Sequence, residues 1–215
     1  MTRYARVVTR LIRGYKHKEK GFGEEYTQNL VDRTRIGEWF LVHKIIPNTL
    51  AKCRGRIVDF GCGIGDILRQ APAGSIGFEV NHSSIEYCKK LGLDVRPYDP
   101  AADDYRLDML EPGVFQTFLM SHVLEHLSDT ANILRKLLTS CHRLDFERVV
   151  IKVPGWFMYK KDSTHVTFVD RAWLRDNALL STEHWNVNEI SYYPINIEWV
   201  GRFSLVHETV IVYTR

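Results

Sequence analysis

Residues 57–66 read Ile-Val-Asp-Phe-Gly-Cys-Gly-Ile-Gly-Asp, a short apolar run followed by three glycines at alternate positions. An apolar run of this length that ends in glycines is typical of a buried strand that enters a tight turn. Because glycine has no Cβ atom, the backbone of such a turn can approach a bound ligand closely, and a helix that follows points its N-terminus at the same ligand. The pattern predicts a strand, a ligand-binding loop and then a helix.

An acidic residue follows near the end of the next apolar run. Glu79 lies eighteen residues after Gly61, in the run from Ser75 to Val80. At the end of a neighbouring parallel strand, its carboxylate could accept both hydrogen bonds of a ribose diol, as in adenosyl-cofactor sites. The alternative is that Glu79 caps the helix that begins near Ser83. The loop and the acid together favour a bound adenosyl cofactor.

Short apolar runs alternate with helical stretches through the middle of the chain, which indicates an α/β protein with a parallel sheet buried on both faces. Further strands are expected near Val95, over 115–120 and over 149–153, and helices over about 82–91 and 129–144. After residue 155 we expect a polar, aromatic loop, a helix over about 170–180, and strands over 188–196 and 207–213 that close as an antiparallel hairpin.

The composition is that of an ordinary globular protein. Of 215 residues, 45% are hydrophobic and 26% are charged, which is typical of one soluble domain. No run approaches the roughly 18 consecutive apolar residues of a membrane span, and the basic N-terminus leads to no apolar signal segment. The four cysteines form no C-x-x-C pair, which argues against a zinc ribbon or a disulfide framework. We expect a cytoplasmic protein.

The basic charge is concentrated in residues 1–20. Seven arginines and lysines oppose one glutamate there, which gives +6 and leaves −3 for the remainder of a chain whose total is +3. The arginines recur at helical spacing with apolar residues between them, which predicts an amphipathic helix. The interpretations are a packing helix with a solvated arginine face, docking on an anionic membrane or glycolipid, and contact with nucleic acid. We place residues 1–50 in an N-terminal helical lid and 51–215 in the main domain.

Two adenosyl cofactors compete for the loop. The dinucleotide pattern G-x-G-x-x-G would place its third glycine at position 66, but that residue is Asp66 and the third glycine is Gly65. Asp59 and Asp66 would repel a pyrophosphate, whereas a ligand with a sulfonium and an ammonium group tolerates acids beside it. These residues favour S-adenosylmethionine over NAD.

Three segments resemble class I S-adenosylmethionine-dependent methyltransferases. They are residues 58–66, 77–80 and 121–127, in the order and at the spacing usual for that family. The resemblance implies a Rossmann-like three-layer αβα sandwich, with a mostly parallel sheet of about seven strands, an antiparallel last strand and additional N-terminal helices. The family usually has an aspartate at the start of the fourth strand. This chain has Gln116 there, which we interpret as variation in a turn.

The same resemblance assigns the cofactor-binding residues. The residues expected to line the methionyl end of the cofactor are Asp59, Gly61, Cys62 and Gly63. Glu79 would hold the ribose and Val80 would pack near the adenine, whose edge would contact Asp108 and Met109, with Asp99 as the alternative. Ser121 and His122 would form the wall of the site beyond the fourth strand.

A histidine cluster follows the predicted fourth strand. His122, Glu125 and His126 fit H-x-x-E-H, an inverted zinc-protease signature, but that signature needs a long helix and a further ligand. Similar segments in some quinone-precursor O-methyltransferases of the family resemble divalent-metal sites. We expect no metal here, because hydrogen bonds from Glu125 and His126 to neighbouring backbone account for the cluster, and a divalent ion held by His122, Glu125 and His126 is the alternative.

Methyl transfer to a hydroxyl usually needs a base, and histidine has a suitable pKa. The candidate is His165, in the polar loop after the fifth strand, where relatives are similar in having a histidine near the acceptor pocket. The alternative is a structural hydrogen bond that orders the loop. Trp156, Phe157 and Tyr159 could line the acceptor pocket by stacking, or could simply pack together.

Two motifs missing from the sequence argue against nucleic acid as the methyl acceptor. Base-modifying relatives resemble one another in an Asn/Asp-Pro-Pro-aromatic turn after the fourth strand, and ribose 2′-O-methyltransferases have an aspartate there with two lysines. This chain has neither, although Lys152 could stand for one lysine. We predict O-methylation of a small molecule or glycan, such as a sugar of a surface polysaccharide or glycolipid. The alternatives are an RNA methyltransferase that uses residues 1–20, a non-catalytic S-adenosylmethionine-binding partner protein, and a nicotinamide oxidoreductase.

Overall fold

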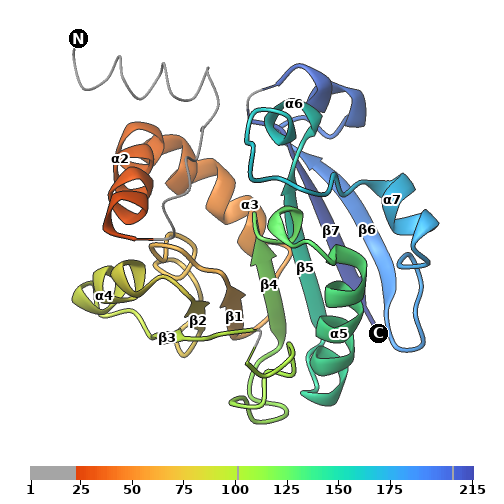
Figure 1. Ribbon diagram of the computed structural model, residues 1–215, viewed down its shortest axis with the longest axis horizontal. Helices are drawn as coiled ribbons and strands as arrows, with labels where there is room; N and C mark the ends of the chain where they lie inside the picture. The colour runs from red at the N-terminus through yellow and green to blue at the C-terminus, as the bar shows by residue number, and fades with distance from the viewer. Residues whose placement is uncertain (1–22, 101, 205) are drawn as a thin grey trace.

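Seven strands form one sheet in the order β3-β2-β1-β4-β5-β7-β6. The computed structural model describes residues 23–100, 102–204 and 206–215 (Figure 1), so the predicted amphipathic helix in residues 1–20 lies outside the described residues. The strands are β1 (Ile57–Phe60), β2 (Ile76–Glu79), β3 (Val95–Pro97), β4 (Thr117–Ser121), β5 (Arg148–Pro154), β6 (Asn186–Tyr193) and β7 (Glu208–Thr214). Only β7 runs antiparallel to its neighbours, β5 and β6, while the other pairs are parallel. The predicted mostly parallel sheet with an antiparallel last strand is confirmed.

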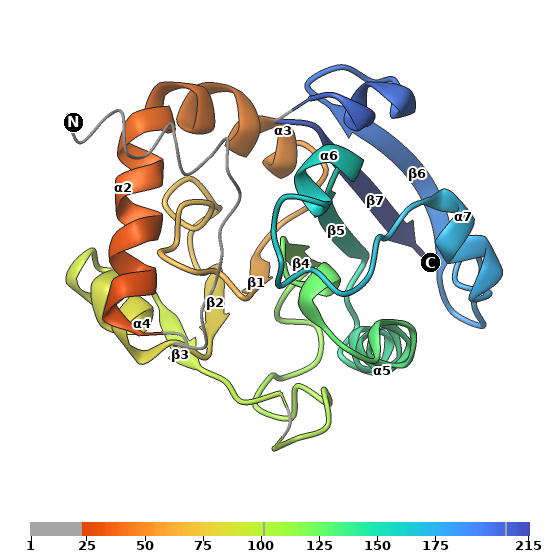
Figure 2. The ribbon, with the colours of Figure 1, turned by 45° about the horizontal axis from the view of Figure 1, so that its top comes forward.

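Helices cover both faces of this sheet, as Figures 1 and 2 show. One face carries α5 (Thr130–Arg143) and α7 (Arg171–Asp176), and the other carries α3 (Ile46–Leu50) and α4 (His82–Lys90). The remaining helical segments are α2 (Glu24–Phe40), a π-helical turn (Leu41–Ile45), α6 (Trp156–Tyr159) and the 3₁₀ turns η2 (Leu124–His126) and η3 (Glu198–Arg202). The three-layer sandwich is therefore the one expected from the sequence. Among the described residues, no helix has both the length and the apolar character needed to cross a bilayer.

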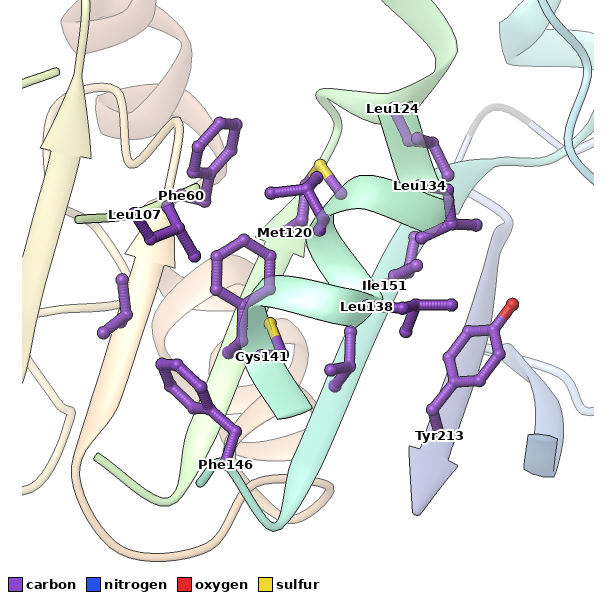
Figure 3. Close-up of a cluster of buried hydrophobic side chains, with 14 of the residues drawn as sticks. Phe60, Leu107, Met120, Leu124, Leu134, Leu138, Cys141, Phe146, Ile151 and Tyr213 are labelled. Atoms are coloured by element: carbon purple, nitrogen blue, oxygen red, sulfur yellow. The ribbon is translucent and has the colours of Figure 1, made fainter. Parts of the chain in front are cut away.

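The main hydrophobic core lies between the sheet and α5. Met120 of β4 and Ile151 of β5 point toward Leu134 and Leu138 of α5, and Phe60 closes the cluster at the β1 side (Figure 3). All four residues of β1 and of β2 are buried. Strands buried on both faces need nearly continuous apolar sequence, which is why these short runs were recognisable.

Gln116 joins the starts of three strands. Its side-chain Oε1 accepts a hydrogen bond from the amide of Arg56 at 2.8 Å, and its carbonyl accepts from the amides of Glu147 and Arg148. The residue thus links the segments that lead into β1, β4 and β5. Gln116 therefore makes structural contacts in the bend before β4.

Two predicted helices are wrong in extent. No α-helix lies between β1 and β2, because residues 61–71 form successive turns. Gly61, Gly63 and Gly65 all have positive φ, and Pro72 disfavours the helical conformation of the residue before it, so too few residues are left for a helix. The helix expected over 170–180 ends at Asp176, because Ala178 adopts a φ of 54°.

Candidate functional site

Glu79 is fixed against the glycine loop at the carboxyl end of the sheet. Its Oε2 accepts a hydrogen bond from the amide of Gly63 at 2.8 Å, and its Oε1 accepts from the amides of Val80 and Asn81, each at 2.9 Å. The acid predicted to face the loop therefore does so. The alternative role belongs to Asn81, whose side chain accepts from the amide of Ser83 and caps α4.

The glycine loop folds back on β2, and side chains leave its backbone uncovered on the ligand side. The amides of Gly61 and Cys62 donate to the carbonyl of Phe78, at 2.9 and 3.1 Å. The Cys62 side chain packs under the loop against Gly77 and Leu68, so only its backbone faces the ligand side. A hydrogen bond with Cys88, together with burial, holds the pKa of the Cys62 thiol well above its usual value. The thiol is therefore a packing group.

Asp59 supplies a buried acid directly below the loop. It is 2% exposed, in the middle of β1. Burial and the repulsion of Glu79 raise the pKa of Asp59 to about 7, against the opposing attraction of Lys152. The site therefore holds a carboxyl that a nearby cation can ionise at neutral pH.

Helix α2 lies over the glycine loop, beside α4 in both ribbon views (Figures 1 and 2). The hydroxyl of Thr27 is 3.0 Å from that of Ser84, and the side-chain amide Nδ2 of Asn81 donates to the Thr27 hydroxyl at 3.1 Å. Leu30 comes within 3.5 Å of the position that a Cβ on Gly63 would occupy. These contacts give residues 24–40 the position that a lid would need, and the boundary at residues 50 and 51 stays a prediction.

The adenine-side residues separate into two groups. Val80 is 55% exposed directly after Glu79, and Tyr98, next to Asp99, donates its amide to the Glu79 carbonyl. Asp108 instead pairs with Arg143, the last residue of α5, and that helix end points to the opposite edge of the sheet. The structure brings Asp99, and not Asp108 with Met109, beside the other cofactor residues.

Beyond β4, His122 joins a charged network. Its Nε2 lies 2.8 Å from Glu208 of β7, and its Nδ1 lies 3.4 Å from Glu125. Partial burial lowers the pKa of His122, but the two carboxylates outweigh it and raise this pKa to about 9. Ser121 stands at the end of β4, opposite Lys152.

A buried ion pair supports that network, and sequence reasoning did not find it. Lys152, 2% exposed, lies 3.0 Å from Glu208 and donates a hydrogen bond to Thr49 of α3, also at 3.0 Å. Burial raises the pKa of Glu208, but Lys152 and His122 outweigh it and lower this pKa to about 2. The available signal was one charged residue in each of two mainly apolar runs, Lys152 within residues 149–153 and Glu208 before residues 209–213.

His165 is largely buried in the loop after β5. Its Nδ1 donates to the carbonyl of Tyr159 at 2.9 Å, and its ring stacks on Tyr159. Its Nε2 lies 3.9 Å from Glu125, and its ring centroid is 4.7 Å from that of His126. The loop-ordering hydrogen bond is present, and the catalytic role of His165 stays a prediction. Trp156 and Tyr159 pack against Phe168 and each other.

Comparison with known proteins identifies the architecture. No protein-family model matches the chain, and no curated protein matches it. Solved structures do match: an S-adenosylmethionine-dependent methyltransferase from Archaeoglobus fulgidus is 21% identical, with 85% of this chain and 94% of that chain covered and a TM-score of 0.56. One from Aquifex aeolicus is 16% identical, with 90% and 98% covered and a TM-score of 0.57. Magnesium protoporphyrin IX methyltransferase from Synechocystis PCC 6803 is 14% identical, with 99% and 94% covered and a TM-score of 0.56.

The chain has the class I methyltransferase fold. The sheet order and the antiparallel β7 agree with the expectation from the sequence, and the covered fractions show that the likeness extends over nearly the whole chain. In this methyltransferase fold the glycine loop, Glu79 and Asp59 meet at the carboxyl edge of the sheet, where open α/β folds bind their ligands.

Gly61 should tolerate no side chain, because two separate costs fall on it. Its φ is 73°, and an added Cβ would lie 2.4 Å from Val123. We expect Gly61→Ala to destabilise the chain by about 2–4 kcal/mol, which combines left-handed strain with overpacking. Gly92, with the same φ of 73° and open space around its Cβ position, is the matched control, and Gly92→Ala should cost only about 1 kcal/mol. Urea unfolding measures both, and equal losses would show that Val123 does not confine the loop.

Proposed function

We propose that this chain is an S-adenosylmethionine-dependent methyltransferase that methylates a hydroxyl group of a small molecule or glycan. The observation that carries the proposal is the 2.8 Å hydrogen bond from Gly63 to Glu79, which puts a ribose-binding acid against a bare backbone turn. The structure of the protoporphyrin methyltransferase with the same fold contains S-adenosylhomocysteine, which supports the choice of cofactor.

The residues around the loop suit the methyl donor better than a dinucleotide. S-adenosylmethionine carries a sulfonium, an ammonium and a carboxylate, so its net charge is positive, whereas NAD has a doubly charged pyrophosphate. Asp59 lies below the loop and Asp66 follows it, and both would repel a pyrophosphate. The reaction itself then depends on holding donor and acceptor in line.

The imidazoles of His126 and His165, beyond β4, can accept the proton of an acceptor hydroxyl. His126 is exposed at the surface, yet partial burial and the neighbouring His165 lower its pKa against the opposing pull of Glu125, which favours the neutral imidazole. His165 stands behind it in the same cluster. A neutral imidazole can accept a proton, whereas His122 is already protonated and acts as a fixed cation.

The state of Lys152 favours a small acceptor over RNA. A ribose 2′-O-methyltransferase needs lysines that reach the substrate, but Lys152 is buried and ion-paired with Glu208. The second candidate function, RNA methylation, then depends only on the basic residues 1–20, and charge alone does not define a substrate.

Cofactor affinity should depend on pH through Asp59. Its pKa of about 7 means that the free protein keeps it protonated just below neutrality, while a cationic cofactor favours the ionised form. We expect affinity for S-adenosylmethionine to rise by up to about tenfold between about pH 5.5 and 7.5, as Asp59 ionises. Asp59→Asn should flatten this dependence without lowering the stability of the free protein, since an acid with a raised pKa costs stability as pH increases. Calorimetric titrations of both proteins check this, and equal slopes would exclude Asp59 as the source.

The proposed function is tested in two steps. Calorimetry with S-adenosylmethionine comes first, and no binding at about millimolar ligand would remove the proposal. Mass spectrometry of metabolites and surface glycans from a deletion strain follows, where we expect a methyl group to be missing from one compound. Transfer of tritium from labelled cofactor to that compound separates an enzyme from a binding-only partner protein. Transfer to RNA instead would establish the second candidate.

A further inference from the structure

Glu125 is a buried carboxylate that the protein leaves without a hydrogen bond. It is 0% exposed, and within the described part of the chain neither Oε1 nor Oε2 has a hydrogen-bond partner. Its backbone carbonyl, by contrast, accepts from the amides of Val166 and Thr167, which fixes η2 against the loop after β5. A buried carboxylate that accepts no hydrogen bond is costly, and His122 approaches it only to 3.4 Å, so the position of Glu125 favours a further cation.

Two imidazoles complete a ligand set around this carboxylate. Glu125, His126 and His165 each offer one ligand atom, and the three atoms lie within 4.8 Å of one another. They come from separate parts of the chain, since Glu125 and His126 belong to η2 and His165 to the loop after α6. The fold therefore assembles a constellation that sequence spacing shows only in part.

Nδ1 of each imidazole already forms a hydrogen bond, with Tyr159 for His165 and with Thr164 for His126. Nδ1 of His165 lies 2.9 Å from the carbonyl of Tyr159, and a carbonyl can only accept a hydrogen bond. Nδ1 therefore carries the proton, and the lone pair is on Nε2, which faces Glu125. The hydroxyl of Thr164 donates its hydrogen bond to Asp162, so Nδ1 of His126 is the donor to Thr164, which again leaves the lone pair on Nε2. Metal-binding histidines characteristically have their second nitrogen held in this way.

We propose that Glu125, His126 and His165 bind one divalent zinc ion. Two imidazoles and one carboxylate are a known protein ligand set for zinc that leaves a fourth position open. Imidazole ligands disfavour magnesium and calcium, which prefer oxygen. Ligand atoms about 2.0–2.1 Å from zinc are separated by about 3.3 Å, so zinc binding would draw the three ligand atoms together from the 3.9 Å between His165 and Glu125 and from separations of up to 4.8 Å.

The surrounding charges permit a dication. Three acids lie near the site, Glu125, Glu208 and Asp162, and Lys152 pairs with Glu208, so two acids are left beside the imidazoles. His122 does not satisfy Glu125 alone, because its Nδ1 is 3.4 Å away while its other nitrogen is 2.8 Å from Glu208. Zinc would take the lone pairs of His126 and His165, so in the metal-bound chain the ion, rather than these imidazoles, would favour loss of the proton of an acceptor hydroxyl, a role that rests on the proposed function.

The full chain, freed of metal with a chelator, should bind one equivalent of zinc in calorimetric titrations with zinc sulfate. Cobalt chloride should give visible ligand-field bands without the near-ultraviolet charge-transfer band of a thiolate. Glu125→Gln and His165→Ala should each weaken zinc binding by about 100-fold. His184→Ala is the matched control, because His184 stacks on His142 at the surface and could hold zinc adventitiously, and this variant should bind like the unmodified chain.

Separate measurements distinguish zinc binding from folding and from cofactor binding. Glu125→Gln should be at least as stable as the unmodified chain without metal, and zinc should raise the melting temperature of the unmodified chain but not of this variant. Absence of zinc binding, a thiolate band, or unchanged affinity in both ligand variants would overturn the proposal. Calorimetry with S-adenosylmethionine on the metal-free chain reports the proposed function independently, so failure of the zinc site would leave that result intact.

Discussion

Glu79→Ala should weaken S-adenosylmethionine binding by about 100-fold or more, since each hydrogen bond to a charged group contributes about 1.5–3 kcal/mol and the ribose would lose two. The substitution also removes the acceptor of the Gly63 amide, so the loop would lose the contact that holds it against β2. Both losses act on binding before chemistry, and we therefore expect the apparent Michaelis constant to rise more than turnover falls.

Calorimetry of three proteins would separate the two losses. Glu79→Gln keeps one oxygen acceptor for the amide of Gly63 but loses the charge, so its affinity should fall between those of the unmodified chain and the alanine variant. Glu86→Ala is the matched control, because the side chain of Glu86 is 44% exposed on α4, away from the glycine loop, and pairs with Lys89. Affinity within about twofold in Glu79→Ala would show that the ribose binds elsewhere.

The sheet and the loop–acid pair could be predicted because each leaves a local mark in the sequence. Buried parallel strands need apolar runs, and a close approach of backbone to ligand needs residues without Cβ atoms. Gly61 directly follows β1 and Glu79 ends the adjacent parallel strand β2, so their meeting followed from strand order. Asp59 was predictable as a site residue, but its raised pKa depends on burial and on Glu79, which only the folded chain defines.

The remaining features depend on contacts between distant segments. The helix after the glycine loop was expected from the usual strand–loop–helix unit, and Pro72 with the left-handed glycines prevented it. Asp108 satisfied the motif's spacing, but Arg143 holds it at the other edge of the sheet. His165 and Glu125 meet only because the loop after β5 returns over η2, so no spacing rule could have paired them.

The buried pair of Lys152 and Glu208 shows how much one such contact can matter. Their side chains are 3% and 11% exposed, and they join β5 to β7, the point at which the sheet changes direction. Lys152→Met should destabilise the chain by about 3–5 kcal/mol, because it leaves Glu208 buried beside His122 alone. Lys152→Met combined with Glu208→Gln should recover much of the loss, since no unpaired charge then remains.

The pH dependence of this loss distinguishes the ion pair from simple packing. Glu208 has a folded pKa of about 2 and an ordinary value of 4.5, so the unfolded chain takes up its proton first as the pH falls. Its contribution to stability is therefore fully present above about pH 4.5 and is lost as the pH approaches 2. Lys152→Met moves the folded pKa upward, so the variant should lose less stability than the unmodified chain between about pH 5 and pH 3. Urea unfolding followed by tryptophan fluorescence measures this difference.

Lys52→Met is the control for removing any lysine from an ion pair. Lys52 pairs with Glu189 at the surface, with side chains 23% and 37% exposed, and such pairs contribute at most about 1 kcal/mol. If Lys152→Met costs no more than Lys52→Met at neutral pH, the charge on Lys152 is dispensable for joining β5 to β7. The network that holds Glu208 against His122 must then be stabilised from the β4 side, through η2 and the loop that carries His165.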